Sequence, residues 1–173
     1  MRILPALVLS AVAGIAATPA SAQNVTVFGN SDAQQCYVYT KLPSASGGED
    51  YCNNALRFEG LSKKDRAATL VNRGIIYNRT RRFAQAFADF EEALAIDANL
   101  GEAYVNRGNT YIFQKDLQRA VDDYSKAIEV GTKDLHAAYY NRGLAYEGLN
   151  ELDLAFNDYL RAIEIRPKWR YAE

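Results

Sequence analysis

Histidine and cysteine are scarce in this chain of 173 residues, and their scarcity excludes several kinds of chemistry. His136 is the single histidine, so a Ser-His-Asp arrangement could be built only on it. One histidine and two cysteines are too few ligands for a metal site built from histidine and cysteine. No glycine-rich phosphate loop is present, and no pair of carboxylates stands out as acid and base. The sequence therefore predicts a protein that is not an enzyme and holds neither cofactor nor metal.

An excess of charge of one sign is also missing. The chain has 20 basic and 21 acidic residues and a formal net charge of −1. Such a balance provides no electrostatic attraction for nucleic acid or for anionic lipid. We therefore expect no nucleic-acid partner.

A long apolar run occurs only in the first 22 residues. Arg2 supplies a positive start, residues 4–17 are apolar, and Ala20-Ser21-Ala22 forms a small-residue cleavage site. The run is too short to span a membrane, and the alternative is a buried first helix. We interpret residues 1–22 as a cleaved signal peptide, with a mature chain that starts at Gln23. The expected location is periplasmic or secreted, without membrane insertion after cleavage.

One segment of seven residues, ending in Asn-Arg-Gly, occurs three times. Its glycines, Gly74, Gly108 and Gly143, lie 34 and then 35 residues apart. A tyrosine, an alanine, an aromatic residue and another alanine follow each glycine at the same distances; in the first copy they are Tyr77, Ala86, Phe90 and Ala93. A fixed period of this length indicates stacked supersecondary units rather than one globular core.

This pattern resembles the tetratricopeptide repeat over about residues 65 to 170. Pro167 alone supplies the closing proline of the family, and Leu70, Tyr104 and Tyr139 stand where the family often has tryptophan. The resemblance implies an all-α fold, an α-solenoid of stacked antiparallel helix pairs. It also implies binding of another protein or peptide segment in a concave groove.

Each copy carries two apolar stripes at helical spacing. They predict helices over 66–79, 83–96, 100–113, 117–130, 135–148 and 152–165. The expected organisation is a signal peptide (1–22), an N-terminal extension (23–62), three repeats (63–98, 99–132 and 133–167) and a C-terminal tail (168–173).

Cys36 and Cys52 are the only cysteines, and an even pair in an exported chain usually forms a disulfide. The run Cys52-Asn53-Asn54-Ala55-Leu56 is similar to Phe90-Glu91-Glu92-Ala93-Leu94 of the first repeat. We therefore expect a degenerate repeat with helices near 32–42 and 49–59, stapled by a Cys36–Cys52 bond.

Each repeat also holds an arginine sixteen residues before an aspartate. The pairs are Arg73 and Asp89, Arg107 and Asp123, and Arg142 and Asp158. We predict a ladder of structural ion pairs, either between the two helices of one unit or across to the next unit.

The resemblance places the first helix of each repeat on the concave surface. It predicts a mostly apolar groove with a few amides, formed by Val71, Asn72, Ile75, Val105, Asn106, Asn109, Ile112, Tyr140, Asn141 and Leu144. The ladder of Asn72, Asn106 and Asn141 has two interpretations, since the amides can bind a peptide backbone or bond their own scaffold. The carboxylate clamp known in this family is absent, and only Asn106 matches it. Whether a strand, a helix or a folded domain occupies the groove stays open.

The C-terminal face of the third repeat offers an alternative function. Trp169 and Tyr171 either fold back over this repeat, or they join Ala155 and Tyr159 in pairing with a second copy. In the second case the chain would be a self-assembling structural component.

Overall fold

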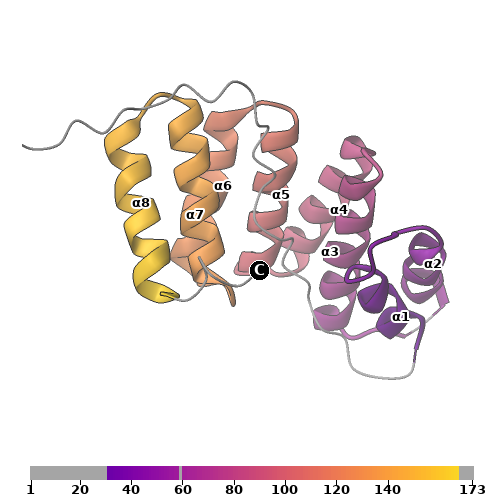
Figure 1. Cartoon of the computed structure of the whole chain (residues 1–173). Coiled ribbons are helices and arrows are strands. Elements are labelled where there is room, and N and C mark those ends of the chain that lie inside the picture. Colours follow the sequence, from indigo (N-terminus) through magenta and orange to yellow (C-terminus); the bar gives the residue numbers. More distant parts are fainter. Residues whose placement is uncertain (1–30, 59, 168–173) are drawn as a thin grey trace, which may run out of the picture.

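The computed structural model describes residues 31–58 and 60–167, and within them the chain forms helices and turns, without strands. Each helix packs antiparallel against the next, and the pairs stack side by side (Figure 1). This confirms the expected all-α solenoid. The eight helices are α1 (Asp32–Tyr39), α2 (Gly48–Phe58), α3 (Lys63–Arg79), α4 (Phe83–Ile96), α5 (Gly101–Phe113), α6 (Leu117–Val130), α7 (Leu135–Gly148) and α8 (Leu152–Ile165).

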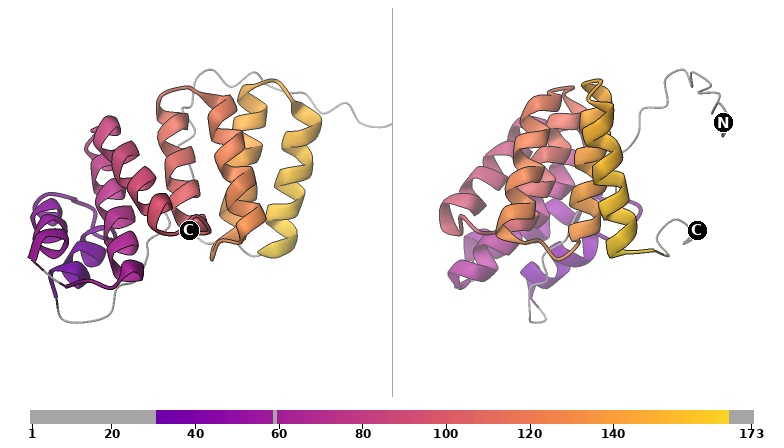
Figure 2. Two further views of the ribbon diagram at one scale, coloured as in Figure 1. Left: turned by 180° about the vertical axis from the view of Figure 1, so that it is seen from behind. Right: turned by 90° about the vertical axis from the view of Figure 1, so that its left-hand side faces the viewer.

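The pairs α3–α4, α5–α6 and α7–α8 are the three repeats, and α1–α2 packs against α3 at the far end from α8 (Figures 1 and 2). We call the first helix of each pair the A helix and the second the B helix. The largest departures from the predicted bounds are at α1, which ends at Tyr39 rather than near residue 42, and at α3, which begins at Lys63 rather than at residue 66. Its start is fixed by Ser62, whose hydroxyl accepts a hydrogen bond of 3.1 Å from the backbone N–H of Asp65.

A glycine of the A helix meets an aromatic ring of the B helix in every repeat. A Cβ atom added to Gly108 would lie 2.7 Å from Cε1 of Tyr124, and one added to Gly74 would lie 2.4 Å from Cε1 of Phe90. Both rings are fully buried, so they have little room to move. Glycine is required here because the ring of the B helix occupies the space that a side chain on the A helix would need.

The N-terminal pair replaces this contact by a covalent bond. Cys36 of α1 and Cys52 of α2 form a disulfide with a Cα–Cα distance of 4.8 Å, and both residues are fully buried beside Ile76. The cysteines are 16 residues apart, the same separation as Gly74 and Phe90. The predicted disulfide is therefore present, and it takes the positions that a glycine and an aromatic ring hold in the other repeats.

The turn between the two helices is also the same in every repeat. Arg81, Lys115 and Asn150 adopt left-handed backbone angles, with φ of 59°, 62° and 63°. The next residue in each turn donates its backbone N–H to a tyrosine carbonyl of the A helix, at 2.8 to 2.9 Å. For residues other than glycine, left-handed backbone angles are unfavourable by about 1–2 kcal/mol. The tertiary contacts of the repeat must therefore stabilise the turn.

The arginine–aspartate pairs form the predicted ladder, and each lies within one repeat. Arg107 donates from Nε and Nη2 to the two carboxylate oxygens of Asp123, at 2.8 and 2.7 Å. The pKa of the Arg107 guanidinium is raised, chiefly by these hydrogen bonds to Asp123. Arg73–Asp89 and Arg142–Asp158 have the same two-bond geometry.

Two of these arginines also reach the repeat before their own. Arg73 donates from Nη1 to Oδ1 of Asn53 on α2 at 2.7 Å. Arg142 donates in the same way to the hydroxyl of Ser125 on α6, at 3.0 Å. At these two junctions the arginine ties its repeat to a polar side chain on the preceding B helix.

Apolar contacts complete each junction between repeats. Phe87 of α4 packs on Tyr111 of α5 with ring centroids 4.7 Å apart, and Phe83 stacks on Phe113 at 5.8 Å. At the next junction Val121 of α6 packs in one cluster with residues of α7. One face of each of these B helices thus receives the following A helix.

Replacing Gly108 by alanine tests the helix crossing. Because the Tyr124 ring is fully buried, overpacking against it should cost about 2–3 kcal/mol, the upper part of the usual range, which exceeds the roughly 1 kcal/mol that alanine gains in helix propensity. We expect urea unfolding to show a net loss of about 1–2 kcal/mol. Gly60→Ala is the control, because nothing lies within 4 Å of the added atom. A Gly108→Ala protein as stable as the wild type would refute the close crossing.

Asp123→Asn tests the ion-pair ladder. It leaves the Arg107 guanidinium, whose side chain is 20% exposed, without its charged partner, and should cost about 3 kcal/mol in free energy of unfolding. The matched control is Glu129→Gln, which breaks the exposed pair with Lys126 and should cost less than about 0.5 kcal/mol. Equal losses in the two variants would show that the ladder does not stabilise the fold.

Candidate functional site

The A helices α3, α5 and α7 lie beside one another, and we call the surface that they share the inner surface. Ten residues were predicted to line a groove on this surface. Three of them, Ile112, Tyr140 and Leu144, are partly exposed. The other seven are buried: Val71, Asn72, Ile75, Val105, Asn106, Asn109 and Asn141. Binding by this set stays a prediction, but in this structure only the first three side chains present surface.

The buried apolar residues of the set belong to the cores of the repeats. Val71 and Ile75 pack in one cluster with Ala33 of α1 and Ala55 of α2. Val105 packs in a second cluster with Val121 and Ala138. The groove prediction took these side chains as a floor, whereas the neighbouring helices cover them.

Three of the predicted asparagines bond the scaffold. Asn106 donates from Nδ2 to the backbone carbonyl of Glu102, four residues earlier, at 2.8 Å. Asn141 donates to Oδ1 of Asn109 at 3.1 Å, and the same oxygen accepts the hydroxyl of Tyr124 at 2.8 Å. These bonds join α5, α6 and α7, so truncation of the amides would disturb the scaffold as well as any ligand contact.

A second polar link between A helices escaped the sequence analysis. Asn78 of α3 and Thr110 of α5 exchange hydrogen bonds of 2.8 and 3.0 Å, and both residues are buried. The signal was weak, because neither residue recurs at the same place in the other repeats.

The α7 end of the inner surface combines apolar groups with one carboxylate. The rings of Tyr140 and Tyr159 lie 5.6 Å apart, and the Tyr159 hydroxyl donates to the exposed Glu147 at 2.6 Å. Burial, first, and the bond to Glu147 raise the pKa of Tyr159 well above its ordinary value. With Leu144 this patch can hold an apolar side chain of a partner and one hydrogen-bond donor beside it.

His136 lies in the first turn of α7 and is buried. Its Nε2 is 3.5 Å from Nη1 of Arg166. Burial, and then the Arg166 charge, lower the pKa of His136. The described part of the chain holds no group of three His, Cys, Asp or Glu residues that could bind a metal ion.

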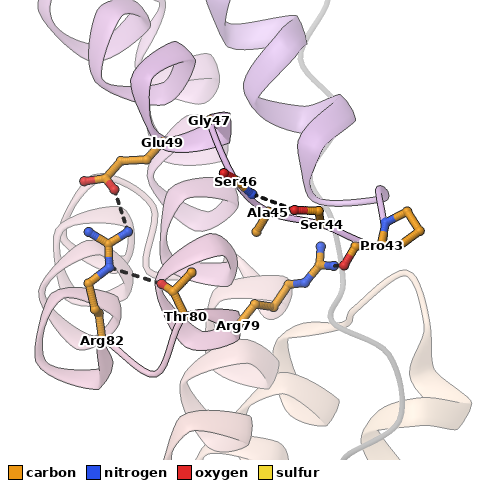
Figure 3. A pocket seen from close by; sticks show the side chains of 9 residues that line it. All are labelled: Pro43, Ser44, Ala45, Ser46, Gly47, Glu49, Arg79, Thr80 and Arg82. Carbon is orange, nitrogen blue, oxygen red and sulfur yellow. Dashed lines mark hydrogen bonds and ion pairs between the residues drawn. The ribbon is translucent and has the colours of Figure 1, made fainter.

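Two hollows lie outside the inner surface. The first, of about 530 Å³, is bounded by the 43–47 loop and the end of α3 (Figure 3). Its charged groups bond one another or the backbone: Arg82 pairs with Glu49 at 2.5 Å, and Arg79 donates to the carbonyls of Leu42 and Pro43. The second, of about 420 Å³, is lined by three apolar residues and five charged ones: Ala67, Ile96, Leu100, Lys63, Lys64, Lys133, Asp97 and Glu102.

The exposed C-terminal surface differs from the predicted one. Ala155 is buried, and Tyr159 lies at the helix crossing over Gly143. The exposed large apolar side chains of α8 are instead Leu152, Leu154, Phe156, Leu160, Ile163 and Ile165. Trp169 and Tyr171, the predicted tail 168–173 and the predicted signal peptide 1–22 lie outside the described residues. Among the helices that are described, none combines the length and apolarity needed to cross a membrane.

Curated relatives match only part of the chain. RNA polymerase II-associated protein 3 of Xenopus tropicalis is 35% identical over 67 residues, which are 39% of this chain and 10% of that protein. Tetratricopeptide repeat protein 6 of Homo sapiens is 32% identical over 63 residues, 36% of this chain and 12% of that protein. The chain thus spans about a tenth of the length of these relatives.

Solved structures share the fold over more of the chain. A crystal structure of MamA superposes with a TM-score of 0.60 at 24% identity, over 71% of this chain and 69% of that one. The Arabidopsis OM64 tetratricopeptide domain gives 0.58 at 22% identity, over 62% and 88%. The first such domain of Spaghetti (RPAP3), bound to the HSP90 peptide SRMEEVD, gives 0.56 at 25% identity, over 59% and 80%.

Family models described as tetratricopeptide repeat match residues 65–133 and 136–168, together more than half of the chain. They cover the three helix pairs from α3 to α8 in which the glycine–aromatic crossings recur. On this sequence match and this architecture, the chain belongs to the tetratricopeptide-repeat family.

Proposed function

We propose that this chain is an exported interaction protein that binds a segment of another protein on the inner surface of α3, α5 and α7, without catalysis. Tetratricopeptide domains generally mediate protein–protein interaction, and a solved relative holds an HSP90 peptide. The observation that carries the proposal is the set of partly exposed apolar side chains on adjacent A helices, Ile112, Tyr140 and Leu144.

The chemistry of these residues defines the ligand. Partly buried aromatic and aliphatic side chains suit a peptide that inserts apolar anchors, in a helical or an extended form. An acidic C-terminus of the HSP90 kind is not the expected ligand, because Val71, Ile75 and Ala137 stand where the family's carboxylate clamp needs polar or basic residues. Asn106, the one matching residue, is buried.

Export is the second half of the proposal. The arrangement of residues 1–22 matches a secretory signal peptide, and the buried disulfide is of the kind that persists in oxidising compartments. A periplasmic or secreted location satisfies both observations.

Selection of peptides from a displayed random library on residues 23–173 tests the binding surface. The selected peptide should bind with a dissociation constant in the micromolar range, and the combined variant Ile112→Ala, Tyr140→Ala, Leu144→Ala should weaken it at least about tenfold through lost anchor contacts, read by titration calorimetry. The control is Leu42→Ala, Phe58→Ala, which removes exposed apolar side chains near the N-terminal pair. Equal binding by both variants would place the ligand elsewhere, and failure to select any peptide would count against the function.

Expression of the full chain in a bacterial host tests export. The protein recovered from the periplasm or the medium should begin at Gln23, because cleavage is predicted after Ala22. N-terminal sequencing measures this directly. Recovery from the cytoplasm with Met1 in place would contradict the proposal.

A further inference from the structure

The exposed apolar surface of the described chain is concentrated on its last helix. Six of the nine exposed large apolar residues belong to α8, which is the outermost helix at the end opposite α1 and α2 (Figures 1 and 2). We call Leu152, Phe156, Leu160 and Ile163 the α8 stripe. Their spacings of four, four and three residues put them on one face of the helix. Contiguous apolar patches of this kind on a protein surface mark interaction sites.

The α8 stripe occupies positions that pack on another helix elsewhere in the array. Counted from the repeat glycine, Phe156 corresponds to Phe87 of α4 and Val121 of α6. Phe87 packs on Tyr111 of α5, and Val121, which is 5% exposed, packs against α7. Phe156 is 62% exposed. The stripe therefore corresponds to the face of α4 and α6 on which the next A helix packs. Among the described residues, no helix follows α8 to cover this face.

One substitution sets this face apart from the α2–α3 and α6–α7 junctions. Asn53 and Ser125 accept a hydrogen bond from the arginine of the next A helix. The corresponding residue on α8 is Leu160, which is 42% exposed and can accept no hydrogen bond. A further repeat of this chain's type, with arginine at this place, would keep its own aspartate partner but would set the remaining N–H group of its guanidinium against leucine, which accepts no hydrogen bond. The stripe thus fits an apolar helix face that lacks this arginine.

We propose that the α8 stripe is a dimer interface, occupied by the α8 stripe of a second copy of this chain in antiparallel orientation. All four residues of the stripe are large and apolar, so the stripe presents an apolar surface to a partner helix that runs in either direction. An antiparallel pair related by a twofold axis sets Phe156 against the second copy's Leu160, and Leu152 against its Ile163. A self-complementary patch is what a twofold dimer needs, and such dimers are the commonest oligomers.

Charge and area are compatible with a second copy. The exposed charges of α8 have both signs, and Arg161 pairs with Glu164 within its own helix at 2.8 Å. The helix therefore has no strong field that would select a basic or an acidic partner. A contact through one helix is smaller than the standard interface of about 800 Å² per partner, so the dimer should dissociate in the micromolar range.

Sedimentation equilibrium of residues 23–173, from about 1 to about 200 µM, tests the interface over the expected range of affinity. We expect a monomer–dimer equilibrium, and Phe156→Asp should raise the dissociation constant more than about tenfold by placing a charge in the apolar contact. The control is Phe58→Asp, since Phe58 is 70% exposed on α2, far from α8. Leu152→Asp is a second interface variant, and circular dichroism verifies that each variant is folded. A monomer at the highest concentration, or a dimer that survives both α8 variants, would overturn the proposal.

Disulfide trapping tests the antiparallel orientation. Copies carrying Leu152→Cys mixed with copies carrying Ile163→Cys should form a cross-linked heterodimer, while each variant alone should cross-link poorly. Efficient cross-linking of either variant with itself would overturn the antiparallel arrangement. A dimer formed by the full chain but lost when the chain ends at Pro167 would show that residues 168–173, rather than the α8 stripe, hold the copies together. None of these measurements depends on peptide binding, so the dimer can fail while the proposed function stands.

Discussion

The close crossing of two helices over a glycine is the constraint on which the repeats depend. At Gly74, Gly108 and Gly143 an added Cβ would lie 2.4 to 2.7 Å from the ring of Phe90, Tyr124 or Tyr159. Because the ring fills the space of the missing side chain, the A and B helices of a repeat have one relative position. The arginine–aspartate pair, sixteen residues apart like the glycine and the ring, can then form in the same geometry three times.

The period of the sequence was enough to predict the fold. Six helices, the ion pairs and the disulfide could be foreseen, because each depends on spacing within one unit or on a short stretch of chain. The groove was harder to predict. Val105 and Tyr140 each stand three residues before the glycine of their repeat, yet Val105 is buried and Tyr140 is partly exposed. The position of a residue in its repeat was known, but its burial depends on the helices that pack beside that repeat.

The two ends of the array show the same dependence on neighbours. Val71 and Ile75 are core residues because α1 and α2 pack over the first repeat. At the other end, Phe156 is exposed, although the corresponding residue of the second repeat, Val121, is buried. Comparison of Leu160 with Glu91 and Ser125 could have revealed this face from the sequence, since an apolar residue at that place breaks the polar series. The features that the repeats share do not reveal this face, because it lies in a residue that differs between them.

The Cys36–Cys52 bond makes one end of the array dependent on oxidation. In the three repeats the helix crossing is made by a glycine and a ring, which need no chemical reaction to pack. At the positions that correspond to this glycine and this ring, the N-terminal helix pair has the two cysteines of the disulfide. Before the bond forms, two small thiols stand where the other repeats have a large ring, so the packing of α1 on α2 is weakest in a reducing environment. Oxidation of these two thiols therefore strengthens the packing of α1 on α2, and with it the cover over Val71 and Ile75.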